Sequence, residues 1–116
     1  MNYSIKPQPA FLRELKRLGK KYRSLKQDLQ KLQDELFANP RAGVDLGGGV
    51  RKVRMAIASK NRGKSHGARV ITFTYTIDED NGTIALLFIY DKEERDNITP
   101  QEIDALVAAA KADAAR

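Results

Sequence analysis

The sequence predicts an α+β fold: a small antiparallel sheet, an N-terminal helical hairpin packed on it, and a C-terminal helix. Three observations support this prediction. Leucines at helical spacing occupy the N-terminal third, alternating or apolar segments occupy the middle, and a capping box opens the last apolar stretch. With 116 residues, the chain has the length of one compact domain, so we expect a single domain over residues 1–116.

The N-terminal segment predicts a short strand followed by two helices. Residues 3–6 alternate apolar and polar side chains before two prolines stop the strand. A first helix begins near Phe11 and is expected to end at Gly19. The second helix ends at Asn39 and carries an apolar stripe at steps of three and four residues: Tyr22, Leu25, Leu29, Leu32 and Leu36. Because the connection is short, the two helices should form an antiparallel hairpin.

The central segment predicts three strands joined as an antiparallel meander. Residues 41–49 are expected to be a loop whose last three glycines turn into the first strand, 50–58. A polar loop, 59–67, leads to a second alternating strand at 70–77. An Asn-Gly pair then makes a hairpin turn into 83–90, which is apolar on both parities and therefore reads as a central strand. The first strand of the chain should join an edge of this sheet.

The C-terminal helix begins at a capping box. Thr99 is the N-cap, Pro100 takes the first helical position and Glu102 completes the box. The helix then presents an apolar face made of Ile103, Leu106, Val107 and Ala110. The predicted order of elements is β-α-α-β-β-β-α.

The composition excludes several classes of protein. The chain has no Cys and one His, which rules out a disulfide framework and a thiol nucleophile and argues against a zinc centre. The longest apolar run, 84–90, is far shorter than the roughly 20 residues of a membrane-spanning helix, and the N-terminus has no signal-peptide core. We therefore expect a cytoplasmic protein with no membrane partner, no metal and no small-molecule cofactor.

Charge is strongly polarised along the chain, although the net charge is only +6. Residues 1–69 hold 17 Lys and Arg against five Asp and Glu, whereas residues 70–116 hold four against ten. Within 41–69 there are eight bases, and Asp45 is the single acid among them. Such a block indicates a polyanionic partner, because uncompensated cations repel one another. A lysine-rich surface that serves only solubility is the alternative.

Four cationic side chains and one tyrosine are expected to converge on one face of the sheet. Lys52 and Arg54 leave the same side of one strand, and Arg69 begins the neighbouring strand. Tyr90 ends the third strand, with Lys92 just beyond it. If the strands pair in order, these groups form a concave basic site.

Such a site suits the cleavage of RNA, whose own 2′-hydroxyl can attack the adjacent phosphorus. Arg clamps a phosphate, a Lys among other cations can exchange a proton, and a Tyr hydroxyl can donate to a reacting oxygen. Further cations nearby are expected to bind RNA: Arg51, Lys60, Arg62 and Lys64. A phosphate-binding face without chemistry explains these residues equally well. The lone His66 lies in a polar loop, where a solvated side chain is the commoner interpretation than a general base.

A family resemblance lies in the order and spacing of six segments: Phe11 to Leu18, Asn39-Pro40, Gly49 to Arg54, Ser59 to Lys64, Gly67 to Ile71, and Ile89 to Lys92. Through these segments nearly the whole chain resembles the RelE/ParE superfamily of toxins from bacterial type II toxin–antitoxin systems. It resembles most the HigB/RelE-like branch that cleaves messenger RNA. The resemblance implies a RelE-like fold and a toxin that enters the ribosomal A site, contacts ribosomal RNA and cuts the message. It also implies a cognate antitoxin, encoded beside the toxin, that neutralises it.

The resemblance also implies roles for individual residues. The family's basic pair falls on Lys52 and Arg54, its phosphate-binding arginine on Arg69, and the lysine after the third strand on Lys92. The sequence departs from RelE in lacking an arginine directly after that lysine and in lacking a C-terminal tyrosine. Tyr90 is the candidate to take over the role of that tyrosine.

Two other functions stay open at this point. The chain could be a ParE-like toxin that inhibits DNA gyrase and hydrolyses nothing, although ParE-type chains lack clustered basic side chains on the sheet. It could also be a basic nucleic-acid-binding module without activity, whose affinity would fall steeply with salt.

Overall fold

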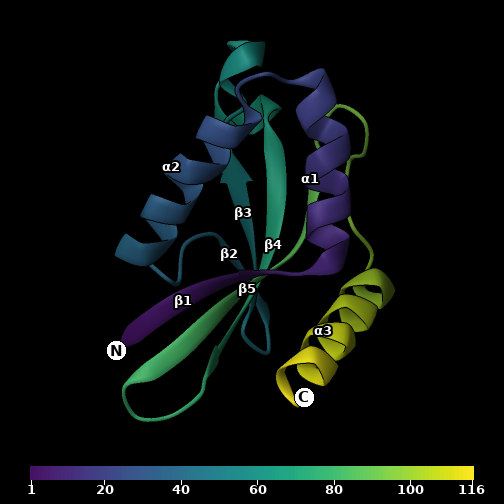
Figure 1. Cartoon of the computed structure of the whole chain (residues 1–116). Coiled ribbons are helices and arrows are strands. Elements are labelled where there is room, and N and C mark those ends of the chain that lie inside the picture. The colour runs from purple at the N-terminus through teal and green to yellow at the C-terminus, as the bar shows by residue number, and fades with distance from the viewer.

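A computed structural model describes residues 1–116 as a five-stranded mixed sheet with helices on both faces (Figure 1). The strands lie in the order β1-β5-β4-β3-β2. Their bounds are β1 Asn2–Pro7, β2 Val44–Gly47, β3 Val50–Met55, β4 Ala68–Thr76 and β5 Asn81–Asp91. β1 pairs with β5 in parallel, and every other pairing is antiparallel. The α+β class, the antiparallel meander and the edge position of the first strand are therefore confirmed.

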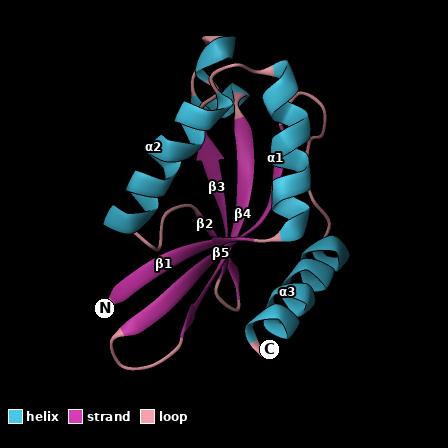
Figure 2. Ribbon diagram, viewed as in Figure 1, coloured by secondary structure: helices cyan, strands magenta, loops and turns pink.

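The helical hairpin covers one face of the sheet. It consists of α1, Pro9–Lys21, and α2, Leu25–Ala38, which lie over the sheet in Figures 1 and 2. The leucines of the predicted stripe lie on the buried side of α2, whereas Tyr22 precedes this helix, which begins at Leu25. They join a core that includes Phe11, Leu18, Leu25, Leu32 and Leu36 together with Val53, Val70, Ile84 and Leu86 of the sheet. Burial of each such side chain contributes about 1.5–3 kcal/mol, which holds the hairpin against the sheet.

The C-terminal helix covers the opposite face. α3, Pro100–Ala114, begins at the predicted capping box, in which both reciprocal hydrogen bonds between Thr99 and Glu102 are formed. Its apolar face packs on a second core that includes Val50, Ile71, Phe73, Ala85 and Leu87. β5 is thus covered on both sides, which explains why its sequence is apolar on both parities. None of the helices is both long enough and apolar enough to cross a membrane.

Several boundaries differ from the sequence-based expectation. α1 does not end at Gly19 but continues to Lys21, because one glycine costs a helix only roughly 1 kcal/mol. The N–H of Tyr22 closes the last turn on the carbonyl of Leu18, and Lys20 and Lys21 suit the negative end of the helix dipole. The expected loop 41–49 contains the edge strand β2, which turns back on β3 through three glycines with positive φ, at 47–49.

The first strand of the meander is also shorter than expected. β3 ends at Met55, and the chain continues into two short 3-10 turns, Ala58–Lys60 and Lys64–His66. There Gly67 crosses so close that a Cβ would lie 2.1 Å from the carbonyl oxygen of Met55. The two turns lie at the end of the sheet next to the loop between α1 and α2 (Figure 1).

Candidate functional site

Three side chains form a row across the sheet. Arg54 of β3 lies directly opposite Arg69 of β4, and Arg69 lies directly opposite Tyr90 of β5. Residues opposite one another in a sheet project to the same face, here the face that carries α3. Lys52 projects from the same face one step along β3, opposite Ile71. The structure thus brings together Lys52, Arg54, Arg69 and Tyr90, which with Lys92 we call the basic site.

Arg69 is the buried centre of this site. Arg69 is only 7% exposed, and its guanidinium donates hydrogen bonds to three backbone carbonyls. These are the oxygens of Lys64 at 3.3 Å, Ala68 at 3.3 Å and Ser65 at 3.2 Å. No carboxylate forms an ion pair with it. The carbonyls orient the guanidinium but carry no negative charge. The positive charge of Arg69 is therefore not neutralised within the protein and suits an anionic ligand.

Tyr90 lies beside Arg69 with its ring almost fully covered. The residue is 3% exposed, and its hydroxyl makes no hydrogen bond with another residue. Burial raises the pKa of Tyr90, against the opposing effect of the nearby Arg69 and Arg95 charges. The phenol therefore stays protonated at neutral pH and can act as a hydrogen-bond donor.

Arg95 completes the wall of the site. Its guanidinium carbon lies 5.9 Å from the centre of the Tyr90 ring and 5.8 Å from that of Phe88, within the range of a cation–π contact. Its Nε donates to the carbonyl of Asn97 at 2.8 Å, and its Nη2 pairs with Glu102 at the start of α3. The hydrogen bond from Arg95 lowers the pKa of Glu102 to about 2. The loop before α3 is thereby fixed against the tyrosine.

The two lysines of the site are held by the same loop. Lys52 donates to Oδ1 of Asn97 at 2.8 Å, and Lys92 donates to the carbonyl of Asp96 at 2.6 Å. Lys92 also pairs with the Asp96 carboxylate at 3.0 Å, and this hydrogen bond is the main cause of the lowered pKa of Asp96. Lys52, Arg54 and Arg69 have no acidic partner, so their charges are available to a ligand.

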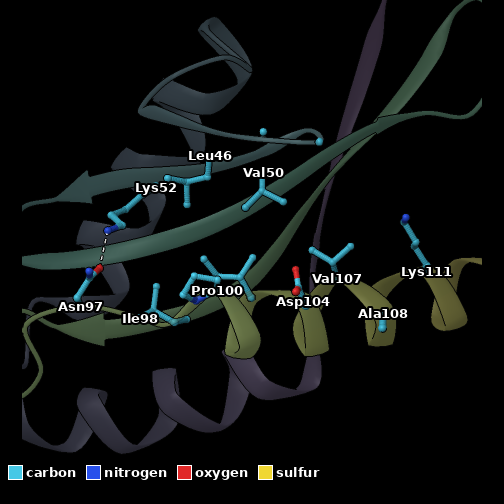
Figure 3. Close-up of a pocket in the computed structure, with 13 residues that line it drawn as sticks. Leu46, Val50, Lys52, Asn97, Ile98, Pro100, Asp104, Val107, Ala108 and Lys111 are labelled. Carbon is cyan, nitrogen blue, oxygen red and sulfur yellow. Dashed lines mark hydrogen bonds between the residues drawn. The ribbon is translucent and has the colours of Figure 1, made fainter.

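An apolar groove opens from the basic site between α3 and the β2–β3 hairpin (Figure 3). It has a volume of about 670 Å³. Lys52 and Asn97 stand at one end, where Figure 3 shows their hydrogen bond, and Lys111 lines it further along the helix. The walls between are formed by Leu46, Val50, Ile98, Ile103 and Val107, and the carboxylate of Asp104 lies among them. The groove provides room for a group attached to an anion held at the basic site.

The four cations expected to bind RNA lie outside this site, and each has an acidic partner. Arg51 faces Asp45 at 3.6 Å, Arg62 faces Glu93 at 3.4 Å, and Lys64 faces Glu35 at 3.2 Å. Lys60 pairs with two acids, Asp91 at 2.6 Å and Glu93 at 3.1 Å, and its side chain is 6% exposed. The expectation that Asp45 alone opposes the basic block is therefore wrong, because α2 and the end of β5 supply the missing acids.

Sequence reasoning missed Arg95 and Asn97 as members of the site. Both lie in an acidic loop, which in the sequence looks like a solvent-exposed connection. No helical or strand periodicity in this loop predicts that it packs beside Tyr90. The only available signal was their position between the end of a strand and a capping box. Elsewhere, no group of three Asp, Glu or His side chains comes together in a way that could hold a metal ion, and the loop residue His66 is exposed.

Most of the chain matches the model of a known protein family. The model of the RelE toxin of the RelE/RelB toxin–antitoxin system matches residues 10–116, which leaves out only the N-terminal strand and the turn after it. The match therefore spans the helical hairpin, the meander, the basic site and α3.

Proposed function

This chain belongs to the RelE family of toxins from type II toxin–antitoxin systems, and we propose that it is a ribosome-dependent endoribonuclease of the mRNA-cleaving, HigB/RelE-like branch. The observation that supports this most is the row Arg54–Arg69–Tyr90, in which a buried guanidinium without a carboxylate lies between an exposed cation and a protonated phenol. A phosphodiester carries the charge that this row lacks.

The reaction we propose is a transesterification that uses the nucleophile of the substrate. A bond forms between O2′ and the adjacent phosphorus while the bond between phosphorus and O5′ breaks, which gives a 2′,3′-cyclic phosphate and a 5′-hydroxyl. Arg69 and Arg54 hold the nonbridging oxygens and stabilise the charge that grows on them. Tyr90, protonated at neutral pH, donates a proton to O5′. The ammonium of Lys52 adds to the positive charge that holds the phosphate, and the proton of O2′ passes to water. These groups need no metal to perform the reaction.

The remaining parts of the site support binding and orientation. Lys92 follows β5 and pairs with Asp96, which holds the loop before α3 beside the site. The groove next to the phosphate position offers room for a neighbouring nucleotide of the message. The chain has a net charge of +6, which favours association with ribosomal RNA at rates that fall with added salt. Toxins of this family pair with an antitoxin, and we propose that an acidic antitoxin segment covers the basic site.

Inducible expression in a bacterium, with primer extension on an abundant message, tests this function. We expect growth arrest and new 5′ ends inside translated codons. Arg69→Ala and Lys52→Ala should abolish both. Arg23→Ala is the matched control, because Arg23 is exposed between α1 and α2 and makes no ion pair. Arrest with intact messages and induced DNA damage would instead identify a gyrase inhibitor, and the absence of arrest would remove the nuclease proposal.

A further inference from the structure

Lys60 occupies a place that does not suit direct contact with RNA. Its ammonium lies on the helical-hairpin side of the sheet, 5.2 Å from the centre of the Tyr22 ring, and its side chain is 6% exposed. A phosphate cannot reach it without displacing two carboxylates, those of Asp91 and Glu93. A buried ammonium that is paired with carboxylates in this way points to a role inside the protein rather than on its surface.

Asp91 is the anchor of this lysine. The carboxylate is fully buried and accepts hydrogen bonds from Lys60 Nζ at 2.6 Å, from the Tyr22 hydroxyl at 2.5 Å and from the backbone N–H of Glu93 at 3.0 Å. Burial acts to raise the pKa of Asp91, but the hydrogen bonds from Lys60 and Tyr22 outweigh it and the pKa is lowered. The pair is therefore charged at neutral pH and fixed by three elements: the α1–α2 connection, β5 and the loop after β3.

Lys60 also binds the turn Lys64–His66, whose carbonyls accept hydrogen bonds from Arg69. Its Nζ donates a third hydrogen bond to the carbonyl of His66 at 2.9 Å. The two preceding carbonyls in the same turn, those of Lys64 and Ser65, accept hydrogen bonds from the guanidinium of Arg69. The turn Lys64–His66 is thus bound by Lys60 on the helical-hairpin side of the sheet, and it binds Arg69 on the α3 side.

A second, independent set of contacts holds the first half of this loop. Ser24 and Ser59 exchange backbone-to-hydroxyl hydrogen bonds at 2.9 and 2.8 Å, and the buried Asp28 accepts from the N–H of Ala58. Loss of the Lys60 contact should therefore loosen the turn Lys64–His66, which keeps only the exposed ion pair of Lys64 with Glu35 as a link to α2, while the preceding turn stays firmly attached.

We propose that Lys60 and Asp91 are positioning residues, which fix the turn Lys64–His66 so that its carbonyls orient the guanidinium of Arg69 toward the substrate phosphate. The catalytic consequence rests on the proposed nuclease function. The restrained orientation of Arg69 does not, because it is a property of the free protein. The two parts can therefore fail separately.

NMR of the Arg69 guanidinium in the purified chain tests the restraint directly. In the wild type we expect slow rotation and slow hydrogen exchange of its N–H groups. In Asp91→Asn, and in the double variant Lys60→Met/Asp91→Asn, both should become at least tenfold faster. The double variant leaves no unpaired buried charge, so it keeps the test valid if Asp91→Asn alone does not fold. Asp113→Asn, which makes the same charge change in the exposed Lys6–Asp113 pair, should leave Arg69 unchanged.

Cleavage of ribosome-bound message supplies the second readout. Asp91→Asn adds one positive charge, so a purely electrostatic role would strengthen RNA binding and speed cleavage. Positioning predicts the opposite: kcat falls by roughly 10–100-fold while KM stays within about twofold, because a misplaced group loses transition-state contacts more than binding. Unchanged Arg69 dynamics in the folded double variant, or unchanged kcat with Arg69 released, would overturn the proposal. Released Arg69 dynamics in a chain whose wild type cleaves nothing would support the restraint and refute the nuclease.

Discussion

Two lysine–aspartate pairs of similar geometry should differ sharply in their contribution to stability. Lys60 Nζ lies 2.6 Å from Asp91 with side chains 6% and 0% exposed, whereas Lys6 Nζ lies 2.8 Å from Asp113 with side chains 50% and 34% exposed. Asp91→Asn leaves the ammonium of Lys60 buried without its main counter-charge, and it weakens the hydrogen bond from the Tyr22 hydroxyl. Removal of one partner from a buried pair costs about 3–5 kcal/mol.

Urea unfolding at pH 7 measures this difference. With a slope of about 1–3 kcal/mol per molar urea for a protein of this size, the loss lowers the unfolding midpoint by at least about 1 M. Asp113→Asn should leave the midpoint within experimental error, since water screens an exposed pair and replaces its contacts. Equal effects of Asp91→Asn and Asp113→Asn would refute the reasoning, because they would show that burial does not decide the contribution of these pairs.

Three further predictions concern the pH dependence of the Asp91 contribution, the capping box of α3 and the phenol of Tyr90. Because the pKa of Asp91 is lowered in the folded state, its contribution is complete above the unfolded pKa of about 4 and is lost as the pH falls through the lower folded value. The urea midpoints of the wild type and Asp91→Asn should therefore converge as the pH falls below about 4. Thr99→Ala breaks the capping box of α3 and should cost about 1 kcal/mol in urea unfolding, whereas Thr99→Ser should cost little; equal losses would contradict a capping role. Tyr90→Phe should lower kcat for message cleavage about 10²-fold without changing the unfolding midpoint, and full activity of that variant would exclude the phenol as proton donor.

The elements of the fold were largely predictable because their signals are local. The leucine spacing of α2, the alternation in β4, the Asn-Gly turn and the capping box of α3 each lie within one short window of sequence. β2 escaped prediction because it has only four residues, all exposed, and its pairing depends on the glycine turn that returns the chain to β3. The end of α1 was misplaced because one glycine costs a helix only about 1 kcal/mol, and the last turn is closed by the hydrogen bond from Tyr22 N–H to the carbonyl of Leu18.

The site was predictable only where strand parity determines it. Lys52, Arg54, Arg69 and Tyr90 share a face because antiparallel pairing in sequence order puts them there. The ion partners of Lys60 could not be found in the same way. Its acids lie 31 and 33 residues further along the chain, and their proximity depends on how the loop after β3 folds back over the end of β5. The position of Arg95 depends likewise on the tertiary course of a loop.

The central claim is that the basic site cleaves messenger RNA on the ribosome. The most direct measurement adds the purified chain to ribosomes paused on a defined message and maps the new 5′ ends, with ribosome-free message as the reference. We expect cuts within the A-site codon that carry 5′-hydroxyls, require the ribosome, fall at least about 10²-fold in Arg69→Lys and persist in Arg23→Lys. An intact message on occupied ribosomes, or wild-type cutting by Arg69→Lys, would contradict the account.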